Sequence, residues 1–223
     1  MKIIHIPDGF LTPEICILMY VISMAILVFS WKKVKAIYSR SFVPLIAVSS
    51  AFVFAAQMLN FPIIYGTSGH LVGGTFLATL LGPYAAILSM TTVLLMQAIF
   101  FADGGLSTFG ANIFNMAIIG GLSFYIIRLL SDEAMSQKRF LASVFVASWV
   151  SVVLGSLVCA IQIGVSPMFA SAGGVLVTVP SMLFWHIIIG AGEAVITTSL
   201  ISQLYRIHPA VLSGLAILRG EMR

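Results

Sequence analysis

The strongest limit on how this chain can fold comes from long apolar segments that carry almost no charge. Hydrophobic residues make up 60% of the 223 residues and charged residues only 8%, whereas about a quarter of the residues in soluble domains are charged. The charged residues lie between the apolar segments, as a hydrocarbon core of about 30 Å requires. The pattern predicts an all-α, multi-pass membrane protein in which residues 1–223 form a single integral-membrane domain.

The apolar segments predict about seven transmembrane helices. Six are long enough to cross alone: Leu11–Trp31, Phe42–Leu59, Tyr84–Phe101, Gly110–Leu130, Phe140–Ile163 and Ser181–Tyr205. The seventh, Leu71–Leu81, stops at a Gly-Pro pair and is too short to cross at about 1.5 Å per residue. We therefore expect it to form a short helix packed inside the bundle.

Basic residues predict the orientation of the chain. Lys32, Lys33 and Lys35 follow the first apolar segment, and positive charge favours the cytoplasmic side. The amino terminus is then outside, and the carboxyl end, with Arg206, Arg219 and Arg223, is cytoplasmic. The net charge of +4 is explained by these flanking bases, because no basic and aromatic face suited to nucleic acid accompanies them.

Motifs of common enzyme classes do not occur in the sequence. There is no G-x-x-x-x-G-K-[ST] phosphate loop, and no H-E-x-x-H or G-x-S-x-G pattern. We therefore expect a protein that is not an enzyme, and any ATP hydrolysis that drives transport would reside in other subunits. Cys16 and Cys159 each lie within an apolar segment, where we interpret them as small packing residues.

Two histidines on the predicted outer side are candidate metal ligands. His5 precedes a Pro-Asp-Gly turn, and His70 lies in an uncharged loop. Imidazole suits borderline divalent metals, and a nearby deprotonated backbone nitrogen would suit an ion that prefers planar nitrogen donors, such as Ni(II) or Cu(II). On geometry alone Co(II) fits less well. The alternative is that both are ordinary polar loop residues.

Further polar residues inside or beside the apolar segments are candidates for supporting roles, because polar groups in a bilayer are costly. His186 and Glu193 share one face of a predicted helix, where they could form hydrogen bonds between helices or line a pathway. Other candidates could satisfy helix ends or orient a ligating imidazole; Asp8 is nearest to His5, and the rest are Gln97, Asp103, Asn112 and Asn115.

Four separated motifs resemble the CbiM/NikM family, the substrate-binding membrane subunits of cobalt and nickel energy-coupling-factor transporters. The motifs are His5-Ile6-Pro7-Asp8-Gly9-Phe10-Leu11, Gly66-Thr67-Ser68-Gly69-His70, Phe101 to Gly105 with Gly110 to Asn112 and Phe114 to Ala117, and His186 with Gly190 to Ala194. The likeness spans about Ile4 to Ser202. It implies a seven-helix fold with the amino terminus threaded into the bundle from outside.

The resemblance also implies a metal in near-planar nitrogen coordination. The matching ligands are His5, His70 and the backbone nitrogen of Ile4. Thr67 and Ser68 of the same loop are candidates for supporting a ligand or lining a pathway. The family usually begins Met-His, whereas Met1-Lys2-Ile3 precede Ile4 here. Three arrangements stay open: the leading residues are removed, the true start is Ile4, or the site uses a deprotonated Ile4 amide or another donor.

The function that follows from the resemblance is capture of Ni(II) or Co(II) as a transported substrate, with no resident cofactor, at a prokaryotic cell membrane. The implied partners are a transmembrane coupling subunit, cytoplasmic ATPase subunits and often a small accessory membrane protein. An organic solute such as a vitamin is the alternative substrate, with His5 and His70 merely lining its pocket. A structural membrane subunit that binds nothing is the third possibility.

Overall fold

The computed structural model describes residues 5–58, 61–62, 68–69, 71–131, 136–212, 214 and 217. Helices dominate these residues: α1 (Pro13–Ile37), α2 (Val43–Gln57), α3 (Gly74–Leu81), α4 (Pro83–Phe101), α5 (Phe109–Asn112), α6 (Ile119–Leu130), α7 (Gln137–Gly164), α8 (Pro167–Ala170) and α9 (Val175–Ile207). Short helical turns are η1 (Arg40–Phe42), η3 (Ile113–Ile118) and η4 (Pro209–Val211). Strands β1 (Phe61–Pro62) and β2 (Ser68–Gly69) form one antiparallel pair.

Helix lengths agree with the predicted membrane spans. Among the described residues, six helical segments are long and apolar enough to cross a membrane: Pro13–Ile37, Arg40–Gln57, Pro83–Phe101, Phe109–Leu130, Gln137–Gly164 and Val175–Ile207. Many large apolar side chains on α1 and α9 are exposed, as expected for surfaces that face lipid tails. The chain is thus a helical, multi-pass membrane protein; its orientation stays a prediction.

Helix α3 lies at the centre of the bundle, as its short apolar run predicts. Every residue of this helix is buried, and it packs against α4, α6 and α7. Gly74 lies so close to α6 that a Cβ atom there would be 2.7 Å from the Cα atom of Gly120. Glycine on both helices therefore permits the close approach that lets a helix too short to cross be enclosed by its neighbours.

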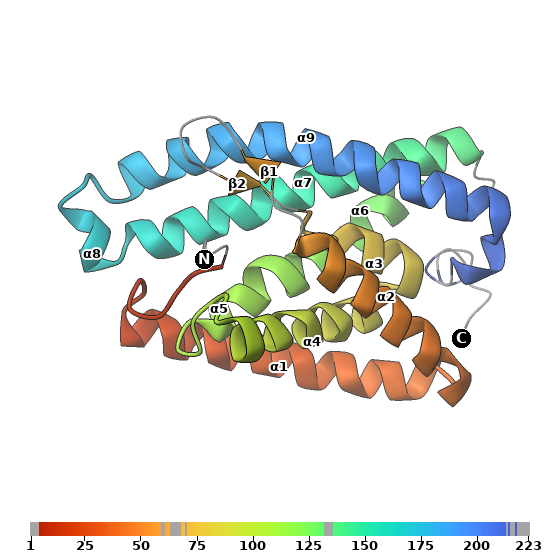
Figure 1. Ribbon diagram of the computed structural model, residues 1–223, viewed down its shortest axis with the longest axis horizontal. Coiled ribbons are helices and arrows are strands. Elements are labelled where there is room, and N and C mark those ends of the chain that lie inside the picture. The colour runs from red at the N-terminus through yellow and green to blue at the C-terminus, as the bar shows by residue number, and fades with distance from the viewer. Residues whose placement is uncertain are drawn as a thin grey trace.

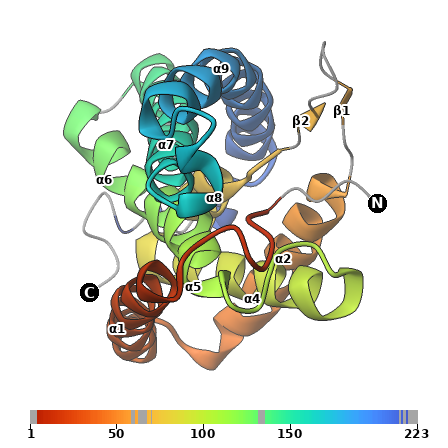
Figure 2. The same cartoon turned by 90° about the vertical axis from the view of Figure 1, so that its left-hand side faces the viewer.

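The amino-terminal segment crosses one end of this bundle (Figures 1 and 2). Helices α7 and α9 run side by side along one face, α1, α2 and α4 form the other, and α3, α5 and α6 lie between them. In Figure 2 the described residues before α1 pass between α8 and the α4–α5 end. The expectation that the chain's start is inserted into the bundle is therefore met for residues 5 and 6, both of which are buried.

Two helix boundaries differ clearly from the prediction. Helix α1 continues past Trp31 to Ile37, and the start of the last span also differs. The last span was expected to begin at Ser181, after Pro180, but α9 begins at Val175 and contains Pro180 in its second turn. At this position proline removes the helical hydrogen bond to the carbonyl of Leu176 and crowds that carbonyl. Membrane helices tolerate such a residue when neighbouring groups satisfy the freed carbonyl.

Candidate metal centre

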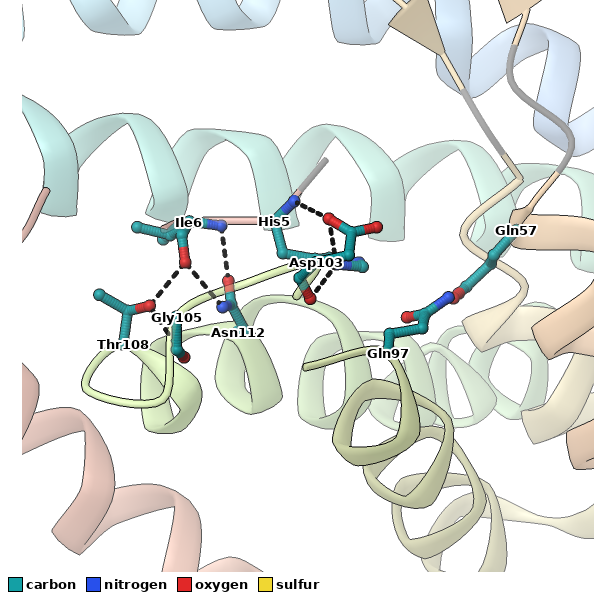
Figure 3. Close-up of polar contacts among 8 residues, drawn as sticks. All are labelled: His5, Ile6, Gln57, Gln97, Asp103, Gly105, Thr108 and Asn112. Atoms are coloured by element: carbon teal, nitrogen blue, oxygen red, sulfur yellow. Dashed lines mark hydrogen bonds and ion pairs between the residues drawn. The ribbon is translucent and has the colours of Figure 1, made fainter. Parts of the chain in front are cut away.

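His5 is held inside the protein by the loop that joins α4 to α5. His5 is buried, with only 6% of its surface exposed. The backbone N–H of His5 donates to the Asp103 carboxylate at 3.3 Å, and the imidazole Nδ1 lies 3.3 Å from both the Asp103 carbonyl and carboxylate oxygens. Figure 3 shows Asp103 facing both His5 nitrogens.

Ile6 is clamped through its backbone. Its N–H donates to Asn112 Oδ1 at 3.0 Å, and its carbonyl accepts from Asn112 Nδ2 at 3.1 Å and from Thr108 Oγ1 at 2.6 Å. The N–H of Gly105 donates to the same carbonyl at 2.9 Å (Figure 3). Asn112 ends α5, immediately before the π-helical turn η3. The loop thus recognises backbone groups of residue 6, which fixes the register of the segment that carries His5.

Asp8 anchors the exposed end of the same segment. Its carboxylate accepts from the backbone N–H of Ser107 at 2.7 Å and from the Ser107 hydroxyl at 2.5 Å. These hydrogen bonds stabilise the charged form and hold the pKa of Asp8 below its ordinary value. Gly105 permits this approach, because a side chain there would overlap the backbone of Asp8.

Two buried glutamines connect this loop with the segment that follows residue 70. The backbone carbonyl of Gln97, near the end of α4, accepts from the N–H of Asp103 at 3.1 Å. Its side-chain amide donates to Gln57 Oε1 at 2.8 Å, and Gln57 Nε2 donates to the carbonyl of Val72 at 2.6 Å. Figure 3 shows the Gln57 and Gln97 amides end to end. The contacts therefore run from beside His5 to two residues after His70.

Glu193 holds the other side of that segment. Its two carboxylate oxygens accept from the backbone N–H groups of Val72, at 2.7 Å, and Gly73, at 2.8 Å. Glu193 is 4% exposed and lies in α9, whereas Gly73 is the residue that precedes α3. A buried carboxylate requires such donors to offset its desolvation, so Glu193 fixes where the chain enters α3.

A cavity of about 120 Å³ lies beside His5. Its wall includes His5, Ile6, Asn112 and Asn115 on one side, and residues of α7 and α9, among them Cys159 and His186, on the other. The Asn115 amide is paired reciprocally with Gln162 of α7, at 2.7 and 3.2 Å. His186 Nδ1 lies 2.8 Å from the carbonyl of Met182 in its own helix. His186 and Glu193 therefore form hydrogen bonds in different parts of the structure, although both lie in α9.

Two predicted ligands, Ile4 and His70, lie outside the described residues. The supporting candidate Thr67 does too, and of Ser68 only the backbone in β2 is described. Within the residues that the structure does describe, no group of three or more His, Cys, Asp or Glu side chains could hold a metal. The described hydrogen bonds therefore show how residues 5 and 6 and residues 72 and 73 are held in place. The complete set of metal ligands stays a prediction.

The structure redistributes the supporting roles that the sequence suggested. Asp103, one of the candidates, contacts the His5 imidazole. Asp8, expected to be its nearest partner, instead binds Ser107, because the turn at residues 7–9 directs its carboxylate to the exposed loop. Gln57 and Thr108 were overlooked. Gln57 carries the same signal as Gln97, an amide within an apolar run, whereas nothing in the local sequence distinguishes Thr108.

Fold and site together define a class: multi-pass membrane proteins whose amino-terminal segment carries a buried histidine and is held by hydrogen bonds from the loop after α4. The family described as "CbiM: Cobalt uptake substrate-specific transmembrane region" matches residues 5–211. The chain belongs to this family.

Named relatives and a solved structure agree with this assignment. A fused protein NikMN of Archaeoglobus fulgidus, to which nickel transport is provisionally assigned, is 39% identical over 93% of this chain and 68% of its own length. The fused nickel transport protein NikMN of Rhodobacter capsulatus is 35% identical over 94% of this chain and 64% of its own length. A crystal structure of a truncated transition metal transporter superposes with a TM-score of 0.82, at 36% identity, over 92% of this chain and 100% of that chain.

The two fused relatives are longer than the part that this chain matches. The chain spans 68% of the first and 64% of the second. Their names concern nickel, whereas the family description concerns cobalt. The family and the membrane fold thus support the interpretation that this chain is a nickel or cobalt transport component rather than an enzyme.

Proposed function

We propose that this protein is the substrate-capture membrane subunit of an ATP-driven, energy-coupling-factor uptake transporter for Ni(II) or Co(II). The observation that carries the proposal is the buried His5, which the loop after α4 holds through its imidazole and its backbone nitrogen. A surface histidine would not require such a frame. The fused nickel transport relatives and the cobalt uptake family model support the choice of substrate.

In the proposed site, the metal is bound by His5, His70 and the backbone nitrogen at Ile4. Asp103 lies 3.3 Å from the two His5 nitrogens that would take part. If the backbone nitrogen of His5 also binds, it must lose its proton, and the Asp103 carboxylate, to which this N–H donates, is placed to accept it. Gln57 and Glu193 hold Val72, two residues after His70, and would position the second imidazole.

Energy for uptake would come from partner subunits. We propose that a transmembrane coupling subunit and cytoplasmic ATPases, with or without a small accessory membrane protein, join this chain in a prokaryotic cell membrane. The absence of a phosphate-loop motif from the sequence is consistent with ATP hydrolysis by the partner subunits.

An organic solute such as a vitamin is the less favoured substrate. The cavity beside His5 has a volume of about 120 Å³, whereas pockets for small organic ligands usually measure about 300–1,000 Å³. A metal ion fits the smaller space, and the names of the relatives point to metals.

Titration calorimetry with Ni(II) and Co(II) on the purified chain tests the proposal. We expect tight binding by the wild type and its loss in His5→Ala and His70→Ala, both with unchanged helical content. His208→Ala is the matched control, because His208 is exposed after the last long helix. Binding that survives in both site variants would contradict the proposal, as would saturable vitamin binding without metal binding.

A further inference from the structure

The cavity beside His5 contains an unusual set of possible donors. Residues of η3, α7 and α9 line it, and four of these residues have a side chain with an imidazole or sulfur donor: His186, Met116, Cys159 and Met182. His5 and Ile6 also line it, so the cavity adjoins the proposed metal centre directly. It reaches Ser151, near the middle of the 28-residue helix α7, and therefore extends into the membrane interior.

Most oxygen and amide groups in the wall are already used in hydrogen bonds. Asn112 binds the backbone of Ile6, and Asn115 is paired with Gln162. The hydroxyl of Ser151 contacts Thr75 Oγ1 at 3.0 Å and donates to a carbonyl of its own helix. The wall thus offers few uncommitted hard oxygen donors, and Mg(II) or Ca(II) would find little to replace its water.

The imidazole of His186 is in the tautomer that a metal requires. Its Nδ1 lies 2.8 Å from the carbonyl oxygen of Met182. A carbonyl can only accept, so Nδ1 carries the proton, and the neutral ring keeps a lone pair on Nε2. A ligating histidine commonly donates its other N–H to a backbone carbonyl in this way.

The donor types in the wall indicate which ions the cavity suits. Imidazole and sulfur suit late first-row ions, which include the proposed substrates.

We propose that this cavity is a second, weaker binding site for the transported metal, formed by His186 Nε2 and Cys159 Sγ with the Met116 and Met182 thioethers beside them. The site rests on the proposed function and deepens it, because an ion leaving His5 would enter this space next. Cys159 binds as a thiolate, and its proton passes to water as the metal binds.

Co(II) titration of the full chain in lipid nanodiscs tests this second site. After the first equivalent saturates, a second equivalent should produce a thiolate-to-cobalt charge-transfer band in the near ultraviolet. Cys159→Ala should abolish the band, and His186→Ala should weaken the second equivalent at least tenfold while the first still binds. Cys16→Ala and His208→Ala are matched controls: Cys16 packs near Leu11 on α1 and His208 is exposed, and neither lines the cavity.

The outcomes separate this inference from the function on which it rests. If the wild type binds the first equivalent and never shows the band, or if the band persists in Cys159→Ala, the second site is wrong and the proposed function stands. If the first equivalent itself fails to bind, both are overturned. Mg(II) in place of Co(II) should not compete for the second equivalent, and effective competition would also overturn the inference.

Discussion

Two segments that flank the candidate metal centre are held in place by different means. Residues 5–8 are held by several hydrogen bonds, which come from Asp103, Gly105, Ser107 and Thr108 of the loop after α4 and from Asn112 of α5. Among the residues that the structure describes, two buried side chains form hydrogen bonds with residues 72 and 73: Gln57 of α2 and Glu193 of α9. One attachment is distributed and reaches the exposed surface, whereas the other is concentrated and buried.

The difference has consequences for stability and for motion. A single substitution removes little from a distributed attachment, so the amino-terminal segment can loosen locally without unfolding the bundle. Loss of one buried partner leaves buried backbone groups without their hydrogen bonds. We therefore expect residues 72 and 73 to act as the rigid side of the centre and residues 5–8 as the adjustable side.

Glu193→Ala should have the largest effect. The variant leaves the N–H groups of Val72 and Gly73 without their acceptors, at a cost of about 1–3 kcal/mol each. The free energy of unfolding should fall by about 2–6 kcal/mol, as measured by denaturation in mixed micelles. Glu193→Gln, which keeps one carbonyl oxygen, should lose less. An alanine variant as stable as the wild type would show that the attachment is not concentrated there.

Gln57→Leu should have the next largest effect, because the Val72 carbonyl and the Gln97 amide both lose their partner, at about 1–3 kcal/mol each. The loss ranks below that of Glu193→Ala because hydrogen bonds to a carboxylate are stronger than those to a neutral amide. A double-mutant cycle with Gln97→Leu should give a coupling energy of about 0.5–3 kcal/mol, as for side chains in one hydrogen-bond network. Strictly additive losses would indicate that the two glutamines act independently.

Asn112→Ala should loosen the amino-terminal segment and leave the bundle folded. The two bonds from Asn112 to the Ile6 backbone are lost, while those from Thr108 and Gly105 remain. A local cost of about 1.4 kcal/mol would weaken nickel binding about tenfold and speed hydrogen exchange at the Ile6 amide. Asn115→Ala, whose partner is Gln162, should leave that exchange rate unchanged. Unaltered exchange in Asn112→Ala would contradict the proposed clamp.

Asp8→Asn should have the smallest effect, and one that depends on pH. The pKa of Asp8 is lowered in the folded protein by its bonds to Ser107, so this contribution to stability is present above the ordinary aspartate pKa. It is lost as the pH falls through the lowered pKa. The difference in melting temperature between wild type and variant should thus shrink on acidification. A difference that grows at low pH would be inconsistent with this contact.

Apolar length and charge spacing are local properties, and they were sufficient to predict the membrane spans and the buried position of α3. His5 and Asp103 were also recognisable, because each is a polar residue beside a glycine-containing turn in an otherwise apolar sequence. Partners were harder to predict. Glu193 lies 121 positions from Val72, and it recognises a backbone group that any residue would supply.

Turn geometry explains the other differences. Asp8 is nearer than Asp103 to His5 along the chain, but the turn after Pro7 directs it to Ser107, whereas the loop after α4 brings Asp103 back from 98 positions away. The boundary at Pro180 could not be predicted either, because the tolerance of proline within α9 depends on neighbouring groups.

Native mass spectrometry at one equivalent of nickel would decide whether the metal centre is built on His5 and His70. The protein mass from the same experiment would show whether Met1-Lys2-Ile3 are retained. We predict one nickel ion on the wild-type protein and none on folded His70→Ala or His5→Ala. Nickel retained by both folded variants would contradict the proposed metal centre.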